Sequence, residues 1–227
     1  MKFIIMIHQI FINIGKGELK DILEFSWPQR KTKTFCETNN IPYTLWGKED
    51  IEDLLEDYPE YKGLYNDFRY DIQRIDFARL LILYHHGGLY FDLDVTPFKE
   101  NVKDICNIFN KEFFIARWNT SHLPYNAIIS CCKRNPLMLD CIKEVERSFY
   151  EKSKMEIYNT WKGRFIFQTT GHYALHRVLK KKVEYTPCVS VFNRIKNIMD
   201  IVPDNKAFFL DTSASVWYSD EFKNRKN

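Results

Sequence analysis

The sequence has no CxxC pair, no long apolar run and almost no imbalance between acidic and basic residues. Without a CxxC pair, the pattern does not favour a zinc knuckle or a dithiol redox site. The six cysteines include the neighbours Cys131 and Cys132, which are poorly placed to bridge each other, so we expect reduced thiols in a cytoplasmic protein. With 33 basic and 30 acidic residues, the net charge of +3 gives no general case for a nucleic-acid partner.

The apolar stretch at residues 3–7 is too short to cross a bilayer, and no small-residue cleavage site follows it. A buried parallel strand explains this stretch better. We therefore expect no membrane span.

The 227 residues contain 45% hydrophobic and 28% charged residues, which is typical of a globular protein with a real core. We find no internal repeat and no low-complexity linker, so the sequence predicts a single domain over residues 1–227. Strand-like apolar runs alternate with helical stretches, which indicates an α/β fold with a mostly parallel central sheet flanked by helices. The expected strands lie at about 3–7, 41–46, 89–95, 113–116, 183–185 and 207–210. The expected helices lie at about 28–38, 49–57, 60–67, 71–86 and 137–150, with another after Gly171.

Two aspartates, Asp92 and Asp94, follow an apolar run and are two positions apart. In an extended chain this spacing places both carboxylates on one side. Two carboxylates at the end of a buried strand repel each other unless a cation lies between them, and hard oxygen ligands favour Mg²⁺ or Mn²⁺. Such an ion can hold a diphosphate and neutralise the charge that grows as it leaves. The alternative is a surface turn that happens to contain two aspartates.

The preceding helix carries Asp76 and Arg79, which are three residues apart and therefore share a helix face. An aspartate can accept hydrogen bonds from sugar hydroxyls, and an arginine can bind phosphate. An ordinary ion pair within the helix is the alternative.

The run at residues 74–94 resembles the DXD sugar-binding glycosyltransferases related to the yeast initiating mannosyltransferase and to bacterial capsular polysaccharide transferases. It is more distantly similar to the glucosyltransferase domain of the large clostridial toxins. The family pattern is roughly D-x-x-R, a helix, and then G-G-x-Y-x-D-x-D. The matching residues are Asp76, Arg79, Gly87, Gly88, Tyr90, Asp92 and Asp94. Further similar segments lie at 7–11, 42–46, 126–129, 170–172 and 211–217.

The resemblance implies a GT-A fold that takes a UDP- or GDP-sugar as its donor and a glycan or another hydroxyl compound as its acceptor. It implies Mn²⁺ or Mg²⁺ as the cofactor and retention of the anomeric configuration. The implied catalytic residues are Asp76, Arg79, Asp92 and Asp94. The implied donor-binding residues are Phe11, Asp76, Arg79, Tyr90, Asp92, Asn126 and Trp217. The implied metal-binding residues are Asp92, Asp94, Asp211 and Ser215.

Several positions depart from the family pattern. Phe11 replaces a tryptophan, and His172 replaces a proline. Asp211 occupies the position of a histidine that supplies a late metal ligand in the wider fold, and an aspartate is an acceptable ligand for either ion. Val216 replaces a serine, although Ser215 is adjacent.

Two other functions remain open. One is an inactive relic that binds only carbohydrate or nucleotide, because function depends on the site and not on the fold. The other is a phosphatase of the haloacid-dehalogenase type, because residues 90–96 are similar to its hhDxDxT motif. That motif normally lies near the first strand and needs a late acidic pair, for which Asp200 and Asp204 are the candidates.

Overall fold

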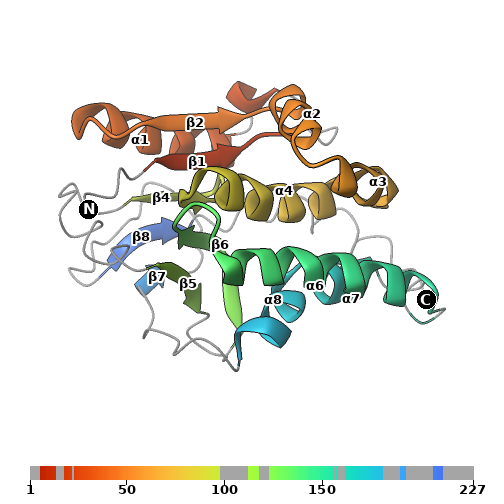
Figure 1. The fold of residues 1–227 in the computed structure, drawn as a ribbon. Helices are drawn as coiled ribbons and strands as arrows, with labels where there is room; N and C mark the ends of the chain where they lie inside the picture. The colour runs from red at the N-terminus through yellow and green to blue at the C-terminus, as the bar shows by residue number, and fades with distance from the viewer. Residues whose placement is uncertain are drawn as a thin grey trace, which may run out of the picture.

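The protein is described here by a computed structural model, which covers residues 6–13, 18–21, 23–97, 112–117, 123–155, 157, 162–180, 190–192 and 207–211. Within these residues, a central sheet has five strands in the order β2-β1-β3-β6-β5. The strands are β1 (Ile7–Ile10), β2 (Tyr43–Trp46), β3 (Gly88–Phe91), β5 (Phe113–Arg117) and β6 (Pro124–Cys131). β1 is parallel to β2 and β3, whereas β6 is antiparallel to β3 and β5. Four of the five strands therefore point the same way, which confirms the expected mostly parallel sheet (Figure 1).

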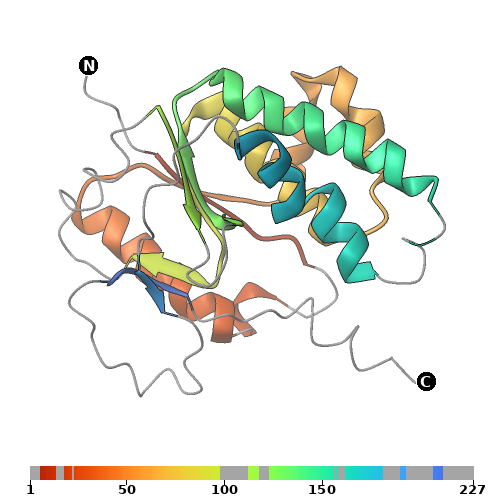
Figure 2. The same ribbon diagram turned by 90° about the horizontal axis from the view of Figure 1, so that it is seen from below.

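Helices cover both faces of this sheet, as Figure 2 shows. The helix α1 (Leu23–Thr38), preceded by a short 3-10 helix at Leu19–Asp21, lies on one side. The helices of the other side include α4, α6, α7 and α8. The bounds of the helices after α1 are α2 (Lys48–Glu56), α3 (Pro59–Asp67), α4 (Asp71–His86), α6 (Pro136–Ser153), α7 (Lys162–Thr169) and α8 (His172–Leu179).

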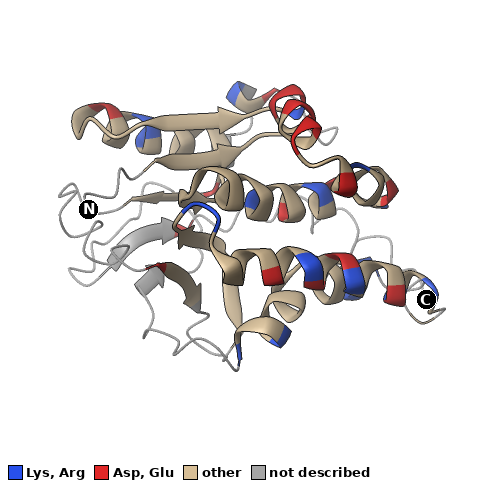
Figure 3. Ribbon diagram, viewed as in Figure 1, with Lys and Arg blue, Asp and Glu red and all other residues tan. Residues whose placement is uncertain are grey.

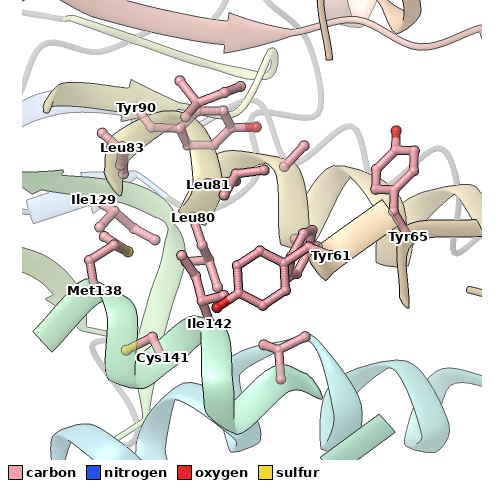
Figure 4. Packing of buried hydrophobic residues seen from close by; sticks show 14 of the residues in the cluster. Tyr61, Tyr65, Leu80, Leu81, Leu83, Tyr90, Ile129, Met138, Cys141 and Ile142 are labelled. Carbon is pink, nitrogen blue, oxygen red and sulfur yellow. The ribbon is translucent and has the colours of Figure 1, made fainter. Parts of the chain in front are cut away.

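The side chains of β3 point alternately into two hydrophobic clusters, one on each face of the sheet. Leu89 and Phe91 pack with Phe35 of α1, whereas Tyr90 packs into the larger cluster on the opposite face. This alternation is what a strand buried on both faces requires. In the larger cluster, α4 lies between α3, α6 and the sheet (Figure 4).

A second sheet of three strands, in the order β4-β8-β7, lies beside the central sheet. Its strands are β4 (Val95–Pro97), β7 (Ser190–Phe192) and β8 (Ala207–Asp211). β8 runs antiparallel to β4, and Asp211 pairs with Val95. The end of β8 is thus brought next to the segment that follows β3.

Most of the expected elements are confirmed within about two residues, but two expectations are wrong. The expected strand at 89–95 is two strands, β3 and β4, separated by a turn. The helix expected to begin at Pro28 begins at Leu23 and contains the proline in its interior. Residues 3–5 of the strand expected at 3–7 lie outside the described residues, and the described strand β1 begins at Ile7 and ends at Ile10.

Among the described residues, four elements were not expected from the sequence, namely the short 3-10 helix at Leu19–Asp21, β6, β7 and α7. The strand expected at 183–185 lies outside the described residues.

Charged residues gather on the outward faces of the helices, most visibly on α2, α3 and α6 (Figure 3). In the part of the chain that the structure describes, no helix is both long and apolar enough to cross a bilayer. The four cysteines in this part, Cys36, Cys131, Cys132 and Cys141, form no disulfide with one another.

Candidate active site

Two adjacent glycines place β3 against its neighbours. Gly87 ends α4 with φ of +71° and Gly88 follows with φ of +99°, both in a region that side chains rarely adopt. A Cβ at Gly88 would lie 2.4 Å from the carbonyl oxygen of Met6. His8 reinforces this junction, because its Nε2 hydrogen-bonds the carbonyl oxygen of Gly87 at 3.0 Å. Burial lowers the pKa of His8 to about 4, so this histidine is a neutral core residue.

The two aspartates of the D-x-D motif lie in a turn and not in extended chain, so the expected strand geometry is wrong. The amide of Val95 donates to the carbonyl oxygen of Asp92 at 3.0 Å, which closes a turn over residues 92–95. The amide of Asp92 donates to the carbonyl oxygen of Ala127 in β6 at 2.9 Å. After this turn the chain continues into β4, which pairs with β8 in the second sheet. Both aspartates therefore lie at the edge where β1, β2 and β3 end.

Arg79 connects the helix α4 to this turn. One of its terminal nitrogens lies 3.1 Å from Asp76 and 3.2 Å from Asp92, and the other donates to the carbonyl oxygen of Asn126 at 2.8 Å. Its guanidinium also lies over the ring of Tyr90, 5.0 Å from the centroid. Burial alone would lower the pKa of Arg79, but the charges around it, Asp92 foremost, raise the pKa above its usual value. Arg79 is therefore a permanent cation shared by two carboxylates.

Asp76 is buried and fully hydrogen-bonded. Its Oδ1 accepts from the amide of Asn126 at 3.1 Å, and its Oδ2 accepts from the hydroxyl of Thr170 at 2.8 Å. Burial raises the pKa of Asp76 to about 6, although Arg79 and Thr170 act in the opposite direction. The intrahelical pair with Arg79 thus exists, but it belongs to a network that also includes β6 and the segment after α7.

Asp92 is the more open member of this network, with 29% of its side chain exposed. Its Oδ1 accepts from the hydroxyl of Tyr90 at 2.8 Å in addition to its contact with Arg79. Among the described residues, its Oδ2 makes no hydrogen bond or ion pair. Asp92 is therefore held in a fixed orientation with one oxygen available to a ligand.

Asp211 approaches the same region from β8. Its side chain is 2% exposed and accepts a short hydrogen bond from the hydroxyl of Tyr125. Burial raises the pKa of Tyr125 well above its usual value, and the charges of Asp211, Asp94 and Asp92 raise it further. Three of the four residues expected to bind the metal ion therefore act on one tyrosine, and the fourth, Ser215, lies outside the described residues.

The oxygen-rich composition of this site fits Mg²⁺ or Mn²⁺ better than a soft metal ion. In the described ranges, no group of three or more His, Cys, Asp or Glu side chains is arranged to hold a metal ion. Mg²⁺ commonly takes only one or two carboxylates from the protein and completes its shell with phosphate oxygens and water. Asp92 and Asp94 fit that requirement.

The remaining expected donor-binding residues lie at the same edge or outside the description. Phe11 directly follows β1, is partly exposed, and its amide donates to the carbonyl oxygen of Trp46 at 2.9 Å. Asn126 lies near the start of β6 and binds Asp76, as described above. Trp217 lies outside the described residues.

Sequence reasoning assigned no role to three residues that hold this site together, namely Gln9, Tyr125 and Thr170. Gln9 and Thr170 stand inside segments that resemble the family pattern, and each is a buried polar residue beside a motif. That signal, a polar residue where the pattern requires burial, could have identified them.

The fold and the site define a GT-A type α/β protein with a carboxylate-rich edge, and comparisons with known proteins agree. Residues 25–114 match the family model described as "Glycosyltransferase sugar-binding region containing DXD motif". The PaToxG glycosyltransferase structure aligns with a TM-score of 0.50 at 14% identity, covering 78% of this chain and 69% of that chain, and this supports the fold.

Two curated yeast proteins show the same relationship. The chain is 27% identical over 220 residues to "Mannosyl phosphorylinositol ceramide synthase SUR1" of Saccharomyces cerevisiae, covering 96% of this chain and 52% of that protein. It is 29% identical over 111 residues to "Inositol phosphoceramide mannosyltransferase 3" of Schizosaccharomyces pombe, covering 46% of this chain and 28% of that protein. The chain thus spans about half the length of the first relative and less of the second.

These matches confirm the resemblance. Residues 25–114 match the sugar-binding region of the DXD glycosyltransferases, and Asp92 and Asp94 are the D-x-D pair within that match.

Proposed function

We propose that this protein is a metal-dependent glycosyltransferase that moves a hexose from a UDP- or GDP-sugar to a hydroxyl group of a glycan or another acceptor, with retention of configuration. The observation that carries the proposal is the turn at residues 92–95. It presents two carboxylates at the carboxyl edge of the sheet, where open α/β folds bind nucleotides. Arg79 fixes one of these carboxylates from the neighbouring helix.

Each residue of the site has a role in this proposal. Asp92 and Asp94 would hold Mn²⁺ or Mg²⁺, which supplies charge neutralisation for the departing diphosphate. Phe11 would stack on the nucleotide base. Trp217 keeps the donor-binding role, and Asp211 and Ser215 keep the metal-binding role, that the resemblance implies.

Asp76 and Arg79 have a more specific role in the proposal. Their exposed fractions are only 5% and 2%, and both oxygens of Asp76 already accept hydrogen bonds. They would therefore act chiefly by orienting Asp92 and lining the sugar side of the site. The Nε of Arg79 is buried and has no hydrogen-bond partner among the described residues.

Retention by front-face attack is the proposed stereochemistry. The buried carboxylate nearest to the D-x-D turn on α4, Asp76, is engaged by Arg79, Asn126 and Thr170. It is therefore poorly suited to act as a covalent nucleophile. Proton NMR of the first-formed product would show the anomeric configuration directly, and an inverted product would contradict this part of the proposal.

Donor turnover tests the proposal as a whole. Purified protein is incubated with a panel of UDP- and GDP-hexoses with Mn²⁺, with Mg²⁺ or with EDTA, and the released nucleoside diphosphate is measured. We expect turnover of at least one sugar donor with metal and none with EDTA. Asp94→Asn should abolish turnover, whereas Asp53→Asn, an exposed position on α2, should leave it unchanged. Nucleotide binding without release would instead indicate an inactive relic, and release of phosphate from simple phosphoesters would indicate a phosphatase.

A further inference from the structure

Gln9 is a buried polar residue in β1 that is not among the residues expected to bind the donor or the metal ion. Its side chain is 0% exposed and lies on the same face of the strand as Ile7, in the cluster covered by α1. A buried amide is costly unless its hydrogen bonds are made. The partners of Gln9 therefore show what this position does.

The amide nitrogen of Gln9 reaches both ends of the turn that carries the two aspartates. Its Nε2 donates to the carbonyl oxygen of Asp92 at 3.1 Å and to that of Val95 at 3.4 Å. Since these are the first and last residues of the turn, one side chain bridges it. The contact is to the main chain, so it restrains the direction of the chain at both ends.

Two further side chains fix the orientation of the Gln9 amide. The hydroxyl of Tyr43 donates to Oε1 of Gln9 at 3.0 Å, and Nε2 of Gln29 on α1 donates to the hydroxyl of Tyr43 at 3.0 Å. Every hydrogen bond in this relay points the same way, toward the turn, and such chains strengthen one another. A flipped amide would direct Oε1 at two carbonyl oxygens, so the relay permits one orientation only.

We propose that Gln9 is a positioning residue that fixes the turn at residues 92–95 and so sets where the two aspartates point. Tyr43 orients Gln9 directly, and Gln29 orients Tyr43. The inference rests on the proposed function for its consequence in catalysis, but the restraint on the turn is a property of the fold. Loss of Gln9 would leave the aspartates in the sequence while loosening the segment that aims them at the metal ion and the diphosphate.

Three variants test this relay: Gln9→Met, Tyr43→Phe and Gln29→Leu. Gln9→Met keeps the length of the side chain and removes its hydrogen bonds. Thr32→Val is the matched control, because Thr32 is equally buried but its hydroxyl bonds a side chain, that of Thr96 at 3.2 Å, and not the turn. All four proteins are first checked for a cooperative thermal transition.

Two measurements are made on each variant. Relative to wild type, hydrogen–deuterium exchange of the amides of residues 92–95 should be accelerated most in Gln9→Met, less in Tyr43→Phe and least in Gln29→Leu. In the control Thr32→Val it should be unchanged. The Mn²⁺ concentration that half-saturates donor turnover should rise about tenfold or more in Gln9→Met, with kcat largely restored at saturating Mn²⁺. A general loss of stability would lower kcat at every Mn²⁺ concentration and would not raise the Mn²⁺ requirement alone.

The outcomes separate the two proposals. Unchanged exchange at residues 92–95 in Gln9→Met overturns the positioning role, and so does an equal rise in the Mn²⁺ requirement of Thr32→Val. If wild-type protein shows no donor turnover and no response to Mn²⁺, the proposed function fails. The exchange series then still decides whether Gln9 holds the turn.

Discussion

Replacing Arg79 by methionine removes the buried cation that Asp76 and Asp92 share. The side chain of Arg79 is only 3% exposed, and it contacts the two carboxylates at 3.1 and 3.2 Å. Breaking a buried pair by removing one partner typically costs about 3–5 kcal/mol, because a buried charge is left uncompensated. Asp92 is 29% exposed and can be solvated, so most of the loss should come from Asp76.

The size of this loss should depend on pH. Burial raises the pKa of Asp76 from 3.8 to about 6 in the folded protein, so protons bind the folded state more tightly than the unfolded state. The stability that the raised pKa of Asp76 contributes is fully present below 3.8, the pKa of Asp76 in the unfolded chain, and is lost as the pH rises through about 6. Without Arg79 the folded pKa of Asp76 should rise further, and each additional unit costs about 1.4 kcal/mol at a pH above both values. The variant should therefore be close to wild type at pH 5 and most destabilised at pH 8.

Urea unfolding at pH 5, 6.5 and 8 measures this dependence. Arg147→Met is the matched control, because Arg147 also pairs with two carboxylates, at 2.8 and 2.7 Å, but its side chain is 51% exposed. Exposed pairs contribute about 0–1 kcal/mol, so the control should lose little stability at any of the three pH values. The reasoning would be refuted if Arg79→Met lost no more stability at pH 8 than Arg147→Met, or if its loss did not change with pH.

Two other substitutions test the surroundings of the site. Gly88→Ala should lower the melting temperature strongly, because φ is +99° there and the new Cβ would lie 2.4 Å from the carbonyl oxygen of Met6. Gly63→Ala in α3, where a Cβ would meet nothing within 4 Å, should leave the melting temperature unchanged or raise it. Equal melting temperatures of the two variants would contradict the role of the close approach. Tyr125→Phe should lower the free energy of unfolding in urea by about 1–3 kcal/mol, because the buried Asp211 loses a hydrogen bond. It should also raise the Mn²⁺ concentration that donor turnover requires, and an unchanged requirement would show that Asp211 is not part of the metal site.

The elements that the sequence specifies locally were predicted well. The helix α4 was expected at residues 71–86 and has those bounds, because a broad apolar face ends at two glycines with positive φ. In contrast, the turn after Phe91 has no glycine, proline or asparagine to mark it. Its direction depends on β4 pairing with β8, more than 100 residues away, so the run of apolar residues was read as one strand.

The site residues also fall into those that local sequence could identify and those that depend on contacts between distant segments. Helix geometry placed Asp76 and Arg79 on one face, and the resemblance to the DXD pattern nominated them together with Asp92 and Asp94. That Asn126 and Thr170 both bind Asp76 could not be derived, since these contacts join segments 50 and 94 residues apart. The role of Gln9 likewise depends on which strand lies beside β1, which only the assembled sheet determines.

The central claim is that Asp92 and Asp94 hold a divalent ion against the diphosphate of a sugar donor. Isothermal titration of Mn²⁺ into the protein, alone and with UDP or GDP present, measures this directly. The account predicts Mn²⁺ binding that is tightened by one of the two nucleotides and is lost in Asp94→Asn while the melting temperature without metal is unchanged. Mn²⁺ binding of equal strength in wild type and in folded Asp94→Asn would contradict it.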